Sequence, residues 1–117
     1  MEFLNLPGAK LKKTVARHRD PPWLFAFSDG KRLCRLVEDW LCQQPLAGKV
    51  NLAKISVDSN RRMFEQFGIV SVPTWIFVNA KVEPVSAWIG PWTRGPEVDG
   101  EIDVNALREF LRSRLMR

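Results

Sequence analysis

Two cysteines, Cys34 and Cys42, are the residues of this chain whose side chains could carry out thiol chemistry. Cationic residues stand close to the first of them, at positions 31, 32 and 35, where a helix is expected to begin. Positive charge and a helix N-terminus both stabilise a thiolate, so one hypothesis is a reactive monothiol at Cys34. The competing interpretation is a thiol buried beneath its own helix and chemically quiet.

The spacing of the two cysteines argues against a disulfide between them. They are eight residues apart on one expected helix, which separates them by about 12 Å at the helical rise per residue. A disulfide needs Cα atoms within roughly 7 Å of each other, so Cys42 is expected to be a small apolar residue. The single histidine, His18, has no clustered cysteines beside it, and we therefore expect neither a metal site nor a cofactor.

Apolar periodicity predicts the elements that would position Cys34. Strands are predicted over Glu2–Leu6, Trp23–Phe27, Val50–Val57, Thr74–Val78 and Val82–Ile89. Helices are predicted over Ala9–Arg19, over Arg32–Gln44, after an Asn60 cap up to a stop at Gly68, and after an Asp103 cap. The order βαβαβαββα predicts an α/β fold with a central mixed sheet flanked by helices. Strands separated by a helix are expected to pair in parallel, and the last two to form a hairpin.

Length and composition predict one globular domain over residues 1–117. No apolar run approaches the roughly 18 residues of a membrane span. The first residues do not resemble a signal peptide, so a cytoplasmic location with reduced thiols is expected. The net charge of +5 is diluted by interleaved acids such as Glu38, which favours solvated helix faces. Nucleic-acid binding is not favoured, because no stripe of basic and aromatic residues is evident.

The segment from Gly48 to Thr74 reads GKVNLAKISVDSNRRMFEQFGIVSVPT. It contains a buried strand that ends before Asp58, a short helix that closes on Gly68-Ile69, and Val72-Pro73-Thr74 at the start of the next strand. With these features in this order, the chain resembles the thioredoxins over nearly its whole length. The resemblance implies the thioredoxin fold, a cis bond at Val72–Pro73 and an adjacent backbone that accepts extended peptide.

The same resemblance implies that the dithiol chemistry of thioredoxins is lost. Core spacing places Cys34 at the resolving position, and the nucleophile position falls on Lys31, or on Arg32 if the gap is placed elsewhere. Gly30 stands where the family has a tryptophan, and Ala26 stands where it has a buried acid. We therefore do not expect an enzyme that works through a CxxC pair.

The resemblance also implies that the segment 91–100, which contains Trp92, is an insertion next to the former active site. This tryptophan is either an anchor for a partner or a plug that fills the vacated groove. The predicted function is a redox-inactive protein-binding module that serves in assembly or in a chaperone-like role. Its binding face would be the former active-site edge, comprising Lys31, Arg32, Val72, Pro73, Gly90 and Trp92. The alternative is a monothiol oxidoreductase or redox sensor that uses Cys34, and the cations at 31 and 32 also fit an anion site.

Overall fold

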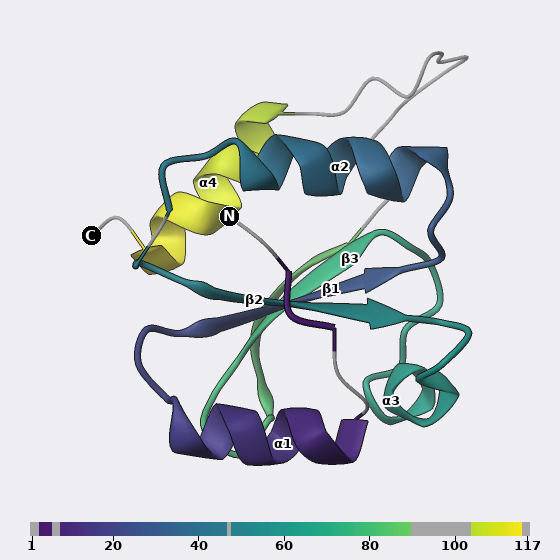
Figure 1. Cartoon of the computed structure of the whole chain (residues 1–117). Helices are drawn as coiled ribbons and strands as arrows, with labels where there is room; N and C mark the ends of the chain where they lie inside the picture. The colour runs from purple at the N-terminus through teal and green to yellow at the C-terminus, as the bar shows by residue number, and fades with distance from the viewer. Residues whose placement is uncertain (1–2, 6–7, 47, 90–103, 116–117) are drawn as a thin grey trace.

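The computed structural model describes residues 3–5, 8–46, 48–89 and 104–115. The helices are α1 (Gly8–Arg17), α2 (Arg32–Cys42), α3 (Arg61–Gln66) and α4 (Val104–Leu115). The strands are β1 (Trp23–Ser28), β2 (Asn51–Ser56), β3 (Thr74–Val78) and β4 (Pro84–Ile89), in the sheet order β2-β1-β3-β4. Helices α2 and α4 cover one face of the sheet, and α1 and α3 cover the other (Figure 1). Within the described ranges, none of the helices is both long and apolar enough to cross a bilayer.

Strand β1 lies at the centre of the sheet and is buried along its whole length. Successive side chains of a strand point to opposite faces. Accordingly, Trp23, Phe25 and Phe27 pack in the core beneath α1 and α3, whereas Leu24 and Ala26 pack beneath α2 and α4. The unbroken apolar run of β1 is the pattern of a strand covered on both faces. The sheet therefore separates two cores, and α2 is held on one of them.

The direction of β3 corrects the expectation of parallel pairing across every helix. Strands β1 and β2 are parallel, but β3 runs antiparallel to β1 and also to β4. The six residues of α3 rise only about 9 Å, whereas a six-residue strand such as β2 spans about 20 Å. Helix α3 is thus too short to carry the chain back to the other end of the sheet. Strand β3 therefore starts beside the end of β1, with Thr74 opposite Phe27, and runs back along β1 in the antiparallel direction.

The expected first strand is represented by one isolated bridge in the described residues, between Leu4 and Ala53. The Leu4 N–H donates to the Leu52 carbonyl at 2.8 Å, and the Lys54 N–H donates to the Leu4 carbonyl at 2.9 Å. Residues 1–2 and 6–7 lie outside the described ranges, so the remainder of the predicted strand stays a prediction. The bridge places the N-terminal segment along the outer edge of β2.

Helix and strand ends are partly as predicted. Asn60 occupies the N-cap position of α3 but makes no side-chain cap; its Nδ2 donates to the Ser56 carbonyl at 3.4 Å and to Ser59 Oγ at 3.3 Å. Gly68 follows α3 with a φ of 65°, the left-handed conformation expected of a helix stop. Strand β4 begins two residues later than predicted, after a turn in which Val82 has a φ of 61°. The predicted Asp103 cap lies outside the described residues.

Candidate functional site

The turn between β1 and α2 is built from the side chains of Ser28 and Asp29. The Gly30 N–H donates to Ser28 Oγ at 3.0 Å, and the Lys31 N–H donates to Asp29 Oδ1 at 2.9 Å. Gly30 has a φ of 75°, which allows the chain to turn sharply before α2, and the N-cap residue Lys31 makes no side-chain cap. The polar residues that follow a buried strand therefore decide how the N-terminus of α2 is presented.

Gly30→Ala is expected to lower the free energy of unfolding by about 1–2 kcal/mol, because a left-handed backbone is unfavourable for a residue with a Cβ. A Cβ at Gly30 would meet no heavy atom within 4 Å, so the loss comes from the backbone alone. Gly30→Asn, which tolerates this conformation, should lose less. Urea unfolding of the two variants checks the prediction, and equal stability of Gly30→Ala and the native protein would contradict it.

Cys34 lies on the inner face of α2 and is only 1% exposed. Burial raises the pKa of its thiol to about 11; the backbone hydrogen bond of Asp29 and the Ser28 hydroxyl offset part of the rise, and the Asp29 carboxylate adds to it. This direction is opposite to the lowered pKa that the reactive-monothiol hypothesis requires. Burial on the inner face of α2 is thus the main reason why the pKa of the Cys34 thiol is raised. Cys42, near the other end of α2, is half-buried.

An ion pair lies one helical turn further along the same face of α2. Glu38 is 7% exposed, and its Oε1 lies 3.1 Å from Lys54 Nζ on β2. Lys54 is in register with Ala26, on the face of the sheet that α2 covers. The sequence interpretation treated Glu38 as a surface acid and was wrong on this point. Its spacing of four residues from Cys34 is the signal that could have revealed it, since such residues share a helix face.

A pocket of about 230 Å³ opens directly before β3. Its lining consists of Asp29, Val57, Phe64, Ile69, Val70, Ser71 and Val72. We call it the Val72 pocket. Val70 is 93% exposed at its rim, whereas Ile69 and Val72 pack partly on the core beneath α3. The Thr74 hydroxyl donates to the Ser71 carbonyl at 2.7 Å, which holds the segment before the cis Val72–Pro73 bond in place.

The structure brings several of the predicted site residues together around Asp29. Its side chain accepts from the Lys31 amide, influences the Cys34 thiol and lines the Val72 pocket. Lys31 and Arg32 are exposed, whereas the Pro73 side chain is fully buried. Pro73 therefore supports the edge from within and offers no side-chain surface to a partner. Gly90 and Trp92, as well as the remainder of segment 91–100, lie outside the described residues.

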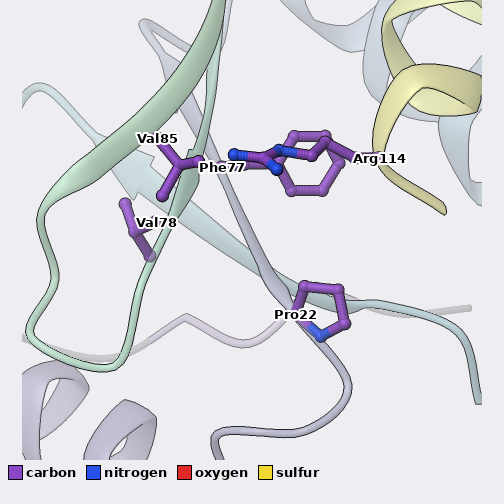
Figure 2. Close-up of a pocket in the computed structure, with 5 residues that line it drawn as sticks. All are labelled: Pro22, Phe77, Val78, Val85 and Arg114. Atoms are coloured by element: carbon purple, nitrogen blue, oxygen red, sulfur yellow. The ribbon is translucent and has the colours of Figure 1, made fainter.

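Another pocket, of about 370 Å³, lies at the opposite end of the sheet (Figure 2). Pro22, just before β1, forms part of its lining, and Arg114 reaches into it from α4 toward β3 and β4 (Figure 2). Of the predicted site residues that the structure describes, none lines this pocket. Among the residues that the structure describes, no group of three or more His, Cys, Asp or Glu side chains is placed to hold a metal ion.

The mixed four-stranded sheet, with α2 and α4 on one face, α1 and α3 on the other and a cis-proline before β3, defines a thioredoxin fold. Solved thioredoxins share it: a reduced Schistosoma mansoni thioredoxin preprotein superposes with a TM-score of 0.75 at 14% identity, covering 97% of this chain and 99% of that one. Chlamydomonas reinhardtii thioredoxin f2 superposes with a TM-score of 0.73 at 17% identity, covering 96% of this chain and 95% of that one. A mutant thioredoxin from Halobacterium salinarum superposes with a TM-score of 0.66 at 22% identity, covering 97% of this chain and 91% of that one.

These identities are low enough that the likeness shows the fold alone. The chain matches neither a protein-family sequence model nor a curated protein sequence. The thioredoxin fold predicted from the segment before Thr74 is thereby confirmed by the structure and by its neighbours. Fold alone does not define an activity, so the function depends on the residues around Asp29.

Proposed function

We propose that this chain is a single-domain protein-binding module that holds an extended peptide segment of a partner protein against the Val72 pocket. The observation that carries the proposal is the combination of an apolar pocket and a nearly fully exposed valine beside a loop whose backbone can accept a further strand. Assembly or chaperone-like work in the cytoplasm is the setting predicted from the sequence. The thiol is not needed for this function.

The Val72 pocket fits an apolar side chain of a partner. Most of its lining is aliphatic or aromatic, and Val57, Phe64 and Ile69 provide side chains from three different segments. Val70, 93% exposed at the rim, would be covered by the bound chain. Covering a valine side chain contributes about 1.5–3 kcal/mol, so this one residue is expected to affect affinity measurably.

The backbone of Val72 fits the addition of a strand. Among the residues that the structure describes, neither its N–H nor its carbonyl has a hydrogen-bond partner. An extended peptide that pairs with these two groups would gain main-chain hydrogen bonds of the kind that β-augmentation uses. Its alternate side chains would then face the pocket and the solvent in turn.

The charges beside the pocket favour a partner segment that carries both a positive and a negative side chain. Asp29 forms the acidic end of the pocket, and Lys31 and Arg32 are exposed at the start of α2. A cationic residue of the partner near Asp29 and an acidic one near Lys31 would complement them. Such rim charges set orientation and association rate more than affinity.

Val70→Asp tests the proposal because Val70 makes little contact with the folded core. A phage-displayed library of random peptides is selected on the native protein, and an enriched peptide is synthesised and titrated by NMR. We expect amide shifts at residues 69–72 and about tenfold weaker binding or more for Val70→Asp, since covering Val70 contributes more than the 1.4 kcal/mol of one decade. The matched control is Val85→Asp, at a valine that is 46% exposed on β4, which should bind normally.

Shifts confined to the other end of the sheet, or equal losses in the two valine variants, would overturn the proposed site. Trp92→Ala tests the sequence-based prediction of an anchor: unchanged peptide affinity would remove Trp92 from the binding face. The place of Gly90 on the binding face likewise stays a prediction from the sequence.

The second candidate function is a monothiol oxidoreductase or redox sensor that uses Cys34. It is favoured by the fold, since the similar solved structures are thioredoxins. Burial and the raised pKa of the Cys34 thiol count against it. Cys34→Ala separates the two candidates, because a binding module keeps its peptide affinity in this variant, whereas a thiol-based function is abolished.

A further inference from the structure

We propose a second site, in which the pocket between α1 and α3 binds the phosphate group of a small phosphorylated ligand. The pocket measures about 360 Å³ and is lined by Lys12 from α1 and by Arg61, Arg62, Met63 and Gln66 from α3. Both helices lie on the face of the sheet away from α2 (Figure 1). Small-molecule pockets occupy roughly 300–1,000 Å³, so this one has room for a phosphate and a modest organic group.

Three cationic side chains line this pocket, and among the described residues no acidic one does. Glu65 follows Arg61 by four residues and Arg62 by three, the spacings at which helical ion pairs form. Nevertheless, within the described ranges neither arginine forms an ion pair, whereas Glu109 and Arg112 on α4 form one at the same spacing of three. The positive charge of the pocket is therefore not compensated by these neighbours. A dianion such as a phosphate monoester complements it.

The uncharged lining adds hydrogen-bond donors. Asn60 is 6% exposed, and its Nδ2 donates to Ser59 Oγ at 3.3 Å. Because the Ser59 oxygen accepts this bond, the Ser59 hydroxyl hydrogen is available to donate to a ligand. The guanidinium groups of Arg61 and Arg62 present donors in the planar fork that matches two phosphate oxygens. Met63 is buried and gives the pocket an apolar floor.

This site is separate from the peptide site proposed above. Helix α3 lies between them, since Phe64 lines the Val72 pocket while Met63 and Gln66 line the α1–α3 pocket. Phosphate binding neither requires nor implies peptide binding. The two proposals can therefore fail independently, and different variants test them.

The test is an NMR titration of the full chain with phenyl phosphate, inorganic phosphate and sulfate at constant ionic strength. We expect saturable shifts of the amides of Lys12 and residues 59–66, with phosphate compounds binding more tightly than sulfate. Arg61→Gln and Arg62→Gln should each weaken phenyl phosphate binding about tenfold, as loss of a charge-assisted hydrogen bond does. Arg61→Lys keeps the charge but loses the fork, so it should fall between the native protein and Arg61→Gln.

The charge-matched control is Arg112→Gln on α4, which removes one positive charge far from the pocket and should leave the affinity unchanged. Circular dichroism confirms that each variant is folded before its titration is interpreted. Shifts that stay linear without saturation, or equal weakening in Arg112→Gln and Arg61→Gln, would overturn the site. Binding of duplex DNA without any saturable binding of phenyl phosphate would also overturn it, because the surface would then be a diffuse polyanion contact.

Discussion

Cys34 in the native protein is expected to react with iodoacetamide at pH 7 about 100-fold more slowly than an ordinary thiol. The thiolate is the reacting species, and its fraction falls about tenfold for each unit by which the pKa rises. Burial beneath α2 raises the pKa of Cys34 from 9.0 to about 11. Limited access to a side chain that is 1% exposed slows the reaction further.

Peptide mass spectrometry of the alkylated protein measures both cysteines in one experiment. Cys42, which is half-buried, is the internal comparison, and the urea-unfolded chain shows the rate of each thiol without burial. A native Cys34 that reacts as fast as in urea would contradict the prediction and make the monothiol function the leading one. A slow Cys34 that becomes fast only in urea counts against the monothiol function.

The same pKa shift predicts how stability depends on alkaline pH. The thiol loses its proton more readily in the unfolded chain, because its pKa there is near 9.0 and in the folded protein it is about 11. The stabilisation of the folded state by the protonated thiol is therefore fully present below about pH 9 and is lost as the pH rises toward 11. A shift of about two units corresponds to about 2–3 kcal/mol.

Urea unfolding at several pH values, compared between the native protein and Cys34→Ala, isolates this contribution. Other groups titrate equally in both proteins, so the difference between the two pH profiles belongs to Cys34. We expect the native protein to lose more stability than Cys34→Ala between about pH 8.5 and about pH 11. Parallel profiles would show that the thiol is ionised with equal ease in the folded and unfolded states.

Lys54→Met is expected to lower the free energy of unfolding by about 3–5 kcal/mol, the cost of leaving a buried charge without its partner. Glu38 has a side chain that is 9% exposed, and its Oε2 already has no hydrogen-bond partner in the described residues. Replacing Lys54 would leave both carboxylate oxygens of Glu38 without a partner among the described residues. Glu38→Gln should cost less, about 1 kcal/mol, because the Lys54 side chain is 28% exposed and can extend into water.

The design includes two further variants. The double substitution Glu38→Leu with Lys54→Met should recover most of the stability, since a buried ion pair replaced by apolar residues is often nearly neutral. Glu109→Gln removes the exposed Glu109–Arg112 pair, whose atoms are 3.7 Å apart, and should change stability by about 0.5 kcal/mol or less. If Lys54→Met is no more costly than Glu109→Gln, the Glu38–Lys54 pair does not stabilise the fold.

The sequence was sufficient to predict the elements wherever the signal is local. The run TWIFV predicted β3 with the bounds that it has, Thr74–Val78, because a buried strand shows as an unbroken apolar run. The helical stop at Gly68 was equally local, since glycine adopts the left-handed conformation at little cost. Boundaries of other elements shifted by a few residues, as in β4, where a turn at Val82 delays the strand.

Only part of the candidate site could be predicted from the sequence. The approach of the segment before β3 to the turn before α2 was implied by the resemblance to thioredoxins, and the Val72 pocket brings Asp29 and Val72 together. The turn at Asp29-Gly30 was predictable from the sequence, but the contacts of Asp29 with the Val72 pocket and the Cys34 thiol were not, although a polar residue directly after a buried strand is a signal of a site at that sheet edge. The environment of the Cys34 thiol was left open between two opposite interpretations.

By itself, the sequence determined the order and kind of most elements, the absence of a CxxC motif and the thioredoxin fold, because these depend on residues that are neighbours along the chain. Only the tertiary structure decided that burial raises the pKa of the Cys34 thiol, and that Glu38 is a buried ion with its partner on another element. It also decided that the cations of α1 and α3 share one pocket. Burial and electrostatics are sums over groups that folding brings together from distant segments. A pattern within one segment does not contain them.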